Sequence, residues 1–193
     1  TASYFLLPEV LGRFRHRYPQ LELKLETGDA ALAVDKVLRE ETDIAIAARP
    51  DALPARLQYC LLQRVPLVFI APRNSTNVSQ WLKDGEPDWS QVPLIVSQQG
   101  LSRKRCDQWF RNKGISPNIY AEVAGNEAIV SMVTLDCGIG LVPEAVIEHS
   151  PLGSQVRVIQ PVPALKPFEV GFCVLKRRLD EPLIQAFWQM VQQ

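Results

Sequence analysis

The chain has 193 residues, of which 47% are hydrophobic, and can therefore build one large domain or two small ones around real cores. Its 21 basic and 21 acidic residues give a formal net charge of zero, which excludes the overall basic field of an autonomous nucleic-acid-binding domain. No apolar run reaches the roughly 18 residues that a membrane-spanning helix needs, and no charged-then-apolar leader opens the sequence. The four cysteines are scattered through apolar segments, which favours reduced thiols in a cytoplasmic protein over a disulfide framework or a zinc site.

The first half of the chain alternates helical and strand patterns. An amphipathic helix with Thr1 or Ser3 as its N-cap ends at Pro19, and leucines alternate with charged residues over 21–25, as in a strand with one exposed face. A turn at 27–29 leads into a second helix, and apolar strands follow at 44–47 and 67–71. Residues 72–89 are polar and rich in turn formers, which indicates a passage out of a first lobe.

The second half repeats this alternation and contains the most informative stretch, Gly125 to Pro143. Asn126 is predicted to cap a helix that Gly138 ends, and Ile139 to Val142 form a short buried strand. The other predicted elements are strands at 94–96, 120–123, 156–159 and 168–175, a helix from Ser102 to Gly114, a proline-rich connector at 161–167 and a final helix over 183–191. This alternation predicts an α/β fold with mostly parallel sheets.

Three predicted helix N-termini could bind an anion, at Thr1–Ser3, at Ser102 and at Asn126. Each presents backbone N–H groups without intrahelical partners and the positive end of a helix dipole, so a carboxylate could be held where several converge. Gln98 and Gln99 lie next to the second of them. Ordinary capping is the alternative explanation for each position.

A basic run, Arg103–Lys104–Arg105, follows Ser102 in the first turn of the predicted helix. Cations there oppose the helix dipole, so a nearby anion would explain them better than helix stability does. The alternative is a solvated surface that forms salt bridges with another subunit. No phosphate-binding loop, no metal motif and no cofactor motif occurs in the sequence.

Several segments together carry a family resemblance over the whole chain. They are, in order, TASYFLLPEVLGRFRHRYP, LELKLETGDAA, REETDIAIA, SRKRCDQWF, GNEAIVSMV and CGIGLVP. This series resembles the effector-binding domain of LysR-type transcriptional regulators. Within the family, EPDWSQVP, GNEAIVSMV and DEPLIQAFW are similar to an activator of branched-chain amino acid biosynthesis.

The resemblance implies a two-lobed, type-II periplasmic-binding-protein-like fold, each lobe a Rossmann-like mixed sheet flanked by helices. Residues 1–72 with 167–193 would form lobe one, without its first strand, and residues 73–166 would form lobe two. The effector would bind between the lobes, near Thr1, Ser3, Ser102 and Asn126, with Gln98 and Gln99 close by. The basic run adds Arg103 as a further candidate for this site. The domain would form a homodimer or homotetramer through Phe14 and Tyr18 against the 102–113 helix of a partner. DNA would be bound only by an N-terminal winged helix-turn-helix that this chain does not contain. The plain alternative for the two aromatic residues is packing within the chain's own core.

Asp29 stands where many relatives have a hydroxyl residue. An acid there opposes a second negative charge but can accept a hydrogen bond from an alcohol. The inducers associated with the branched-chain regulator, acetolactate and acetohydroxybutyrate, carry a carboxylate, a ketone and a tertiary hydroxyl, and Asp29 could bind that hydroxyl. The simpler interpretation is that Asp29 caps the helix beginning at Ala30.

Two other functions fit the same fold. One is a secreted solute-binding protein, which the scattered cysteines disfavour. The other is an enzyme such as a phosphoribosyltransferase or a deaminase, but His16 and His149 are the only histidines and no catalytic motif accompanies either. The sequence therefore favours a domain that binds a small carboxylate without transforming it.

Overall fold

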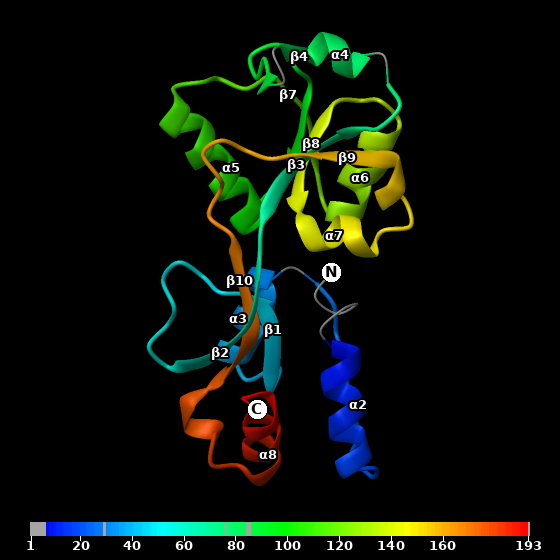
Figure 1. The fold of residues 1–193 in the computed structure, drawn as a ribbon. Helices are drawn as coiled ribbons and strands as arrows, with labels where there is room; N and C mark the ends of the chain where they lie inside the picture. Colours follow the sequence, from blue (N-terminus) through cyan, green and yellow to red (C-terminus); the bar gives the residue numbers. More distant parts are fainter. Residues whose placement is uncertain (1–6, 29, 76, 84–85, 193) are drawn as a thin grey trace. The chain divides into compact units, whose positions relative to one another are not determined.

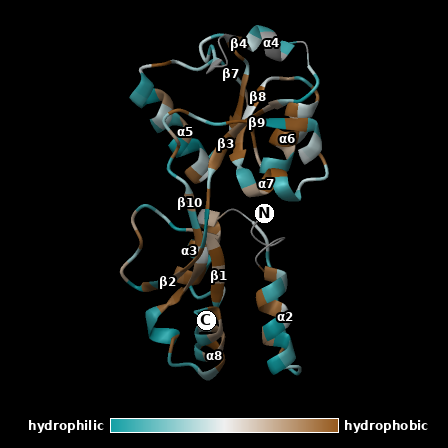
Figure 2. Cartoon of the chain, viewed as in Figure 1, coloured by the Kyte–Doolittle hydropathy of each residue, from teal (hydrophilic) through white to brown (hydrophobic). Residues whose placement is uncertain are grey.

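A computed structural model describes residues 7–28, 30–75, 77–83 and 86–192 (Figure 1). The chain divides into two compact units, one made of Thr1–Arg64 with Glu169–Gln193 and the other of Val65–Phe168. Each unit has its own sheet and its own cores. In Figure 2 the strands of both sheets are predominantly hydrophobic, whereas the helices show both hydrophobic and hydrophilic residues along their length.

The first unit is a three-stranded sheet with helices packed on both faces. Its elements are α2 (Leu7–Arg17), α3 (Ala30–Leu38), β1 (Ile44–Ala48), β2 (Leu57–Val65), β10 (Phe168–Leu175), the 3-10 turn η2 (Lys176–Arg178) and α8 (Pro182–Val191). The strand order is β1-β10-β2, and β10 is antiparallel to β1. Side chains alternate along β10, so Phe172 and Val174 pack with α2 and α8, while Cys173 and Leu175 pack with α3.

The second unit is a five-stranded mixed sheet of order β7-β6-β8-β3-β9. Its elements are β3 (Leu67–Pro72), α4 (Asn77–Trp81), β4 (Leu82–Lys83), β5 (Glu86–Pro87), β6 (Leu94–Ser97), α5 (Gly100–Lys113), β7 (Ile119–Val123), α6 (Asn126–Thr134), β8 (Ile139–Pro143), α7 (Glu144–His149), η1 (Gly153–Gln155) and β9 (Val156–Ile159). Strand β6 runs parallel to both β7 and β8, whereas β3 is antiparallel to β8 and β9. The α/β fold is confirmed, and so is the mixed sheet that the family resemblance implied; the mostly parallel sheet that the alternation of helices and strands predicted is wrong.

Helices α5 and α6 cover opposite faces of this sheet (Figure 1). Val68 and Ile70 point to the face of α6, where Ile129, Val130 and Val133 are fully buried. Phe69, between them in β3, points to the other face and packs on Trp109 of α5, with ring centroids 5.4 Å apart. Because successive strand residues face opposite ways, β3 anchors both helices.

The strand predicted over residues 21–25 is wrong. The structure gives this segment no strand pairing, and Leu23 and Leu25 are 51% and 59% exposed. Alternating leucine and charge has the right period for a strand, but a strand also needs a neighbour for its backbone hydrogen bonds. Among the described residues, no strand is hydrogen-bonded to this segment.

The boundary between the units differs from the one expected near Pro72 and Pro167. The compact units meet after Arg64 and after Phe168, so β3 belongs to the second unit. Its ladders with β8 and β9 account for this placement. An all-apolar strand shows only that it is buried, and its sheet partners are set by residues far away in the sequence.

Phe14 is buried within its own unit. For this residue the structure agrees with packing in the chain's own core, the alternative to a contact with a second subunit. Its ring lies 4.9 Å from Tyr18 and 5.2 Å from Phe187, centroid to centroid. Phe14 is only 3% exposed and therefore offers almost no surface to another copy of the chain.

All four cysteines are free, and two are buried among apolar side chains. Burial raises the pKa of the Cys106 thiol to about 12 and that of Cys173 to about 11, so both thiols stay protonated and unreactive at neutral pH. In the part of the chain that the structure describes, no helix has the length and apolar character needed to cross a bilayer.

Ile129 packs α6 against the sheet and offers a mild test of that core. Its side chain is 0% exposed, and Ile129→Val is expected to lower the free energy of unfolding by about 0.5–1.5 kcal/mol, because one buried methyl group is lost. Urea denaturation of the two proteins should show a lower midpoint with an unchanged slope. An unchanged midpoint would mean that the α6 face is less tightly packed than the structure indicates.

Candidate functional site

The carboxyl ends of β6 and β7 lie side by side in the second unit. The two strands are parallel, with Ser97 opposite Val123 at their last residues. Helix α5 follows β6 after Gln98 and Gln99, and α6 follows β7 after Ala124 and Gly125. Because α5 and α6 cover opposite faces, this edge is a topological switch point, where open α/β sheets bind ligands.

The first helix at this edge, α5, begins at Gly100. Gln99 is its N-cap, with φ −155° and ψ −175°, and makes no side-chain cap hydrogen bond. Ser102 is therefore the third helical residue, and the prediction that it caps the helix is wrong. Both glutamines are exposed, and Ser102 is half-buried. The N–H groups of the first helical turn have no intrahelical acceptor, and the Gln99 side chain does not cap them. They can therefore donate to a ligand.

The second helix, α6, begins at Asn126, one residue earlier than expected if Asn126 were its N-cap. Its N-cap is Gly125, whose φ of 98° is strained for any residue with a side chain. A glycine cap has no side chain to donate or accept, so the amides of this first turn receive no cap bond from it either. Asn126 lies half-buried in the first turn.

Two contacts join the start of α5 to the end of β7. The backbone N–H of Gln98 donates to the carbonyl oxygen of Val123 over 2.9 Å. The Arg103 guanidinium lies 2.6 Å from a carboxylate oxygen of Glu122 and 2.8 Å from one of Asp107. These contacts bring Gln98, Ser102 and Arg103 to the strand that leads directly into α6.

Arg103 therefore has anionic neighbours within its own chain. Its hydrogen bond with Glu122, and then that with Asp107, raises the pKa of Arg103, while burial acts in the opposite direction. The sequence argument asked for an anion near this cation, and Glu122 and Asp107 meet that need. Asp107 follows Arg103 by four residues, a spacing that could have revealed the pair. No sequence spacing could have revealed the pair of Arg103 and Glu122, because Glu122 comes close to Arg103 only through the position of β7 in the sheet.

Thr1, Ser3 and Asp29 lie outside the described residues, so their predicted roles stay predictions. The five other predicted site residues, Gln98, Gln99, Ser102, Arg103 and Asn126, all lie at the edge formed by β6 and β7.

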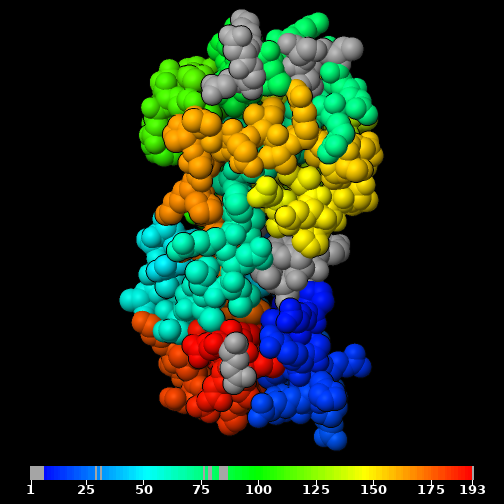
Figure 3. All heavy atoms as spheres, in the orientation of Figure 1, coloured from blue at the N-terminus to red at the C-terminus, as the bar shows by residue number. Residues whose placement is uncertain are grey.

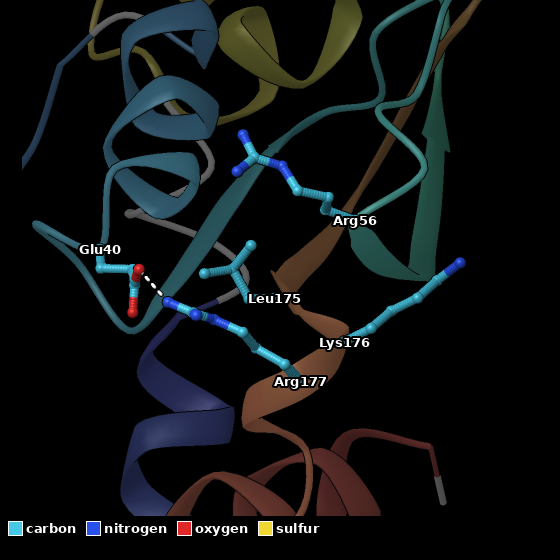
Figure 4. A pocket seen from close by; sticks show the side chains of 5 residues that line it. All are labelled: Glu40, Arg56, Leu175, Lys176 and Arg177. Atoms are coloured by element: carbon cyan, nitrogen blue, oxygen red, sulfur yellow. Dashed lines mark hydrogen bonds and ion pairs between the residues drawn. The ribbon is translucent and has the colours of Figure 1, made fainter.

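A separate hollow of about 310 Å³ lies in the first unit, between α3, β10 and η2 (Figure 4). Its lining includes Arg56, Lys176 and Arg177, but these cations do not converge. Arg177 is hydrogen-bonded to Glu40, and in Figure 4 the Lys176 side chain points away from both arginines. The hollow contains none of the predicted site residues, and its geometry does not present several donors to one anion.

No group of three or more histidine, cysteine, aspartate or glutamate side chains suited to a metal ion occurs among residues 7–28, 30–75, 77–83 and 86–192.

Curated relatives resemble the chain along its whole length. It is 46% identical to the transcriptional activator IlvY of Salmonella typhimurium over 99% of the chain and 66% of that protein, slightly less than two thirds of its length. It is 42% identical to IlvY of Haemophilus influenzae over 100% of the chain and 66% of that protein.

Solved structures share the fold at lower sequence identity. The cofactor-binding domain of the Cbl transcriptional regulator has a TM-score of 0.78 at 23% identity and covers 98% of this chain and 83% of its own. The effector-binding domain of QuiR in complex with shikimate has a TM-score of 0.78 at 20% identity, covering 100% of this chain and 91% of its own. The regulatory domain of Synechocystis CcmR in complex with 2-PG has the same TM-score at 19% identity, covering 100% of this chain and 92% of its own.

A family match decides the classification. The LysR substrate binding domain family matches residues 1–193, the full length of the chain. This domain is regulatory and not catalytic. With its two α/β units and its IlvY-like sequence, the chain belongs to the LysR substrate-binding domain family, the effector-binding part of LysR-type transcriptional regulators.

Proposed function

We propose that this domain binds a small organic carboxylate at the edge formed by β6 and β7. The observation that carries the proposal is the presence, at one sheet edge, of two helix N-termini whose N-caps make no side-chain cap bond. The donors would be the first-turn backbone N–H groups of α5 and α6, with the Ser102 hydroxyl and the side-chain amides of Gln98, Gln99 and Asn126. Thr1, Ser3 and Asp29 would complete the set. Arg103, bonded to Glu122 and Asp107, would hold the start of α5 in place and add positive potential.

The energetics require more than one helix. Each helix N-terminus contributes about 0.3–1 kcal/mol to an exposed anion, and up to ~2 kcal/mol when the anion is partly buried. Two together supply at most about 4 kcal/mol, which corresponds to a millimolar dissociation constant. Hydrogen bonds from Ser102 and the glutamine side chains, at about 1.5–3 kcal/mol each to a charged group, would bring the affinity toward micromolar.

Acetolactate and acetohydroxybutyrate are the proposed effectors. Support comes from the identity of 46% and 42% with IlvY activators and from the chemistry of these acids. Each has one carboxylate for the helix N-termini and one tertiary hydroxyl that an acceptor such as Asp29 could bind. QuiR, which has the same fold, was solved with shikimate, another hydroxylated carboxylic acid.

The role of the full-length protein is part of the same proposal. A regulator of branched-chain amino acid biosynthesis would act in the cytoplasm as a homodimer or homotetramer, and would bind DNA through an N-terminal winged helix-turn-helix. The effector would bind one arrangement of the domains more tightly than another and thereby shift their populations. A shift from mostly inactive to mostly active needs about 5.5 kcal/mol of differential binding, which several subunits can share.

Adding a ligand tests the proposal directly. A ligand that binds only the folded state stabilises it by about 2.7 kcal/mol at 100 times its dissociation constant. We expect acetolactate and acetohydroxybutyrate to raise the melting temperature, whereas pyruvate, which lacks the hydroxyl, should do so much less. Ser102→Ala should weaken binding by about 10–150-fold, the loss of one hydrogen bond to a charged group, without lowering the melting temperature of the free protein by more than a degree or two. Failure of both hydroxy-keto acids to shift the melting temperature at millimolar concentration would refute this choice of effector.

A further inference from the structure

The segment between β9 and β10 lies along α5 and is bound to it by three side chains. We call residues 160–168 the connector. Arg105 Nη1 donates to the carbonyl oxygen of Lys166 over 3.0 Å, Trp109 Nε1 donates to that of Pro163 over 2.6 Å, and Lys113 Nζ donates to that of Val162. Successive donors are spaced four residues apart, so the three side chains form one stripe along the helix. Figure 3 shows the connector, in orange, against α5, in green.

The three donors are themselves held in place by packing. Arg105 is only 8% exposed, and its guanidinium lies 4.6 Å from the centroid of the Phe168 ring. Trp109 is 6% exposed and packs on Phe69 and Trp89. The Lys113 ammonium lies 4.6 Å from the centroid of the Trp109 ring. Burying an arginine is costly, and the bond from Arg105 Nη1 to Lys166 and the contact with the Phe168 ring offset part of that cost. This stripe is therefore a specific attachment and not a solvated helix face.

The connector depends on these donors for its position. It contains three prolines, which lack N–H groups, and no described residue of it belongs to a strand before Phe168. In a sheet, such carbonyl groups would accept hydrogen bonds from a neighbouring strand. Here the carbonyl groups of residues 162, 163 and 166 accept them from side chains of α5 instead. The connector continues covalently into β10 of the first unit.

The other end of α5 is the proposed effector site. The helix has 14 residues and so spans about 20 Å at 1.5 Å per residue. Its backbone hydrogen bonds make it stiff along its axis, so a displacement of the first turn moves the whole stripe of donors. One rigid element thus joins Gln99–Ser102 to the connector.

We propose that α5 couples the effector site to the connector. Occupancy of the first turn changes how firmly the stripe Arg105, Trp109 and Lys113 holds residues 162–168, and by reciprocity the state of the connector changes effector affinity. The identity of the input rests on the function proposed above, whereas the mechanical link within the second unit stands on its own contacts.

The link is tested first without any ligand, by amide hydrogen exchange. Lys113→Met keeps the length and apolar stem of the side chain, which is half-buried at the helix end, but removes its donor to Val162. We expect exchange to rise by about 2–10-fold at the connector amides and also at the amides of Gln98–Arg103. Lys104→Met, on the exposed surface of the same helix, is the matched control and should change neither region. An increase confined to the connector would overturn the coupling.

A ligand arm separates this inference from the proposed function. Acetolactate should slow exchange in the connector as well as at residues 98–103, and Lys113→Met should change its dissociation constant by about 5-fold or more. Binding with protection confined to residues 98–103 and 125–127, and an unchanged dissociation constant, would overturn the coupling while supporting the binding site. If acetolactate does not bind, the choice of effector fails, and the exchange measurements on the free protein still decide the coupling.

Discussion

Replacing Gly138 with alanine is expected to lower the free energy of unfolding by about 2–5 kcal/mol, the sum of backbone strain and overpacking. Gly138 has φ +147°, and a Cβ atom there would lie 2.2 Å from the carbonyl oxygen of Pro93. That carbonyl also accepts the N–H of Ile139 over 2.9 Å, so β8 cannot move away without losing a hydrogen bond at its first residue. The clash involves backbone atoms, which cannot rotate out of the way as a side chain could.

Gly12→Ala is the matched control for this prediction. Gly12 lies on the exposed surface of α2, and no atom other than those of the adjacent residues and the helix's own backbone lies within 4 Å of the position a Cβ would take. Alanine should raise the free energy of unfolding by about 0.5–1 kcal/mol, because it restricts the unfolded chain. Urea denaturation of both variants measures the two effects. A Gly138→Ala protein within about 0.5 kcal/mol of the parent, the range of an ordinary surface substitution, would contradict the close approach of Gly138 and Pro93.

Gly138 also shows why a local pattern can lead to the wrong role. The sequence predicted that this glycine ends the helix from Asn126, but α6 ends at Thr134. The residue in the left-handed conformation is Asp136, with φ 62°. The N–H of Asp136 bonds to Val133 and that of Cys137 bonds to Met132, the two bonds of a Schellman motif. Gly138 is needed for its contact with Pro93, which lies 45 positions earlier and leaves no mark on the local sequence.

Ser102→Asp is expected to weaken binding of acetolactate at least about 100-fold while leaving the fold as stable or slightly more stable. An acid in the first turn of α5 favours the helix by about 0.3–1 kcal/mol. The same acid repels a carboxylate bound at that turn. Two like charges about 4 Å apart near a protein surface interact by about 4 kcal/mol, and about 2.7 kcal/mol already corresponds to 100-fold in affinity. Calorimetric titration measures the affinity, and thermal melting measures the stability.

Ser102→Asn controls for size at the same position. Asparagine has nearly the volume of aspartate and no charge, and its side-chain N–H groups can still donate to a carboxylate, so the affinity should stay within about 10-fold of the parent. If the aspartate and asparagine variants bound acetolactate equally well, electrostatic repulsion could not be the cause of weaker binding by Ser102→Asp. A Ser102→Asp protein with parental affinity would exclude the first turn of α5 from the effector site.

Regular elements with strong periodicity were predicted closely. The strands at Val156–Ile159 and Phe168–Leu175 have the expected bounds, and α5 ends before Gly114, whose φ is 66°. Strand β2 was missed, because buried and exposed residues do not alternate regularly over Leu57–Val65. The N-caps lie one residue before Asn126, at Gly125, and three residues before Ser102, at Gln99, because an N-cap is chosen by the conformation of the preceding turn as well as by residue type.

The sequence by itself determined the α/β class, most helices and strands, and the membership in the LysR substrate-binding domain family, because periodicity, caps and motifs act between residues close together in the chain. Tertiary structure alone decided that β3 belongs to the second unit, that Arg103 pairs with Glu122, and that α5 holds the connector through Arg105, Trp109 and Lys113. These contacts join residues tens of positions apart, and their partners are selected by how strands pair and helices pack. No local sequence pattern specifies which residues become partners, so these contacts are visible only in the folded chain.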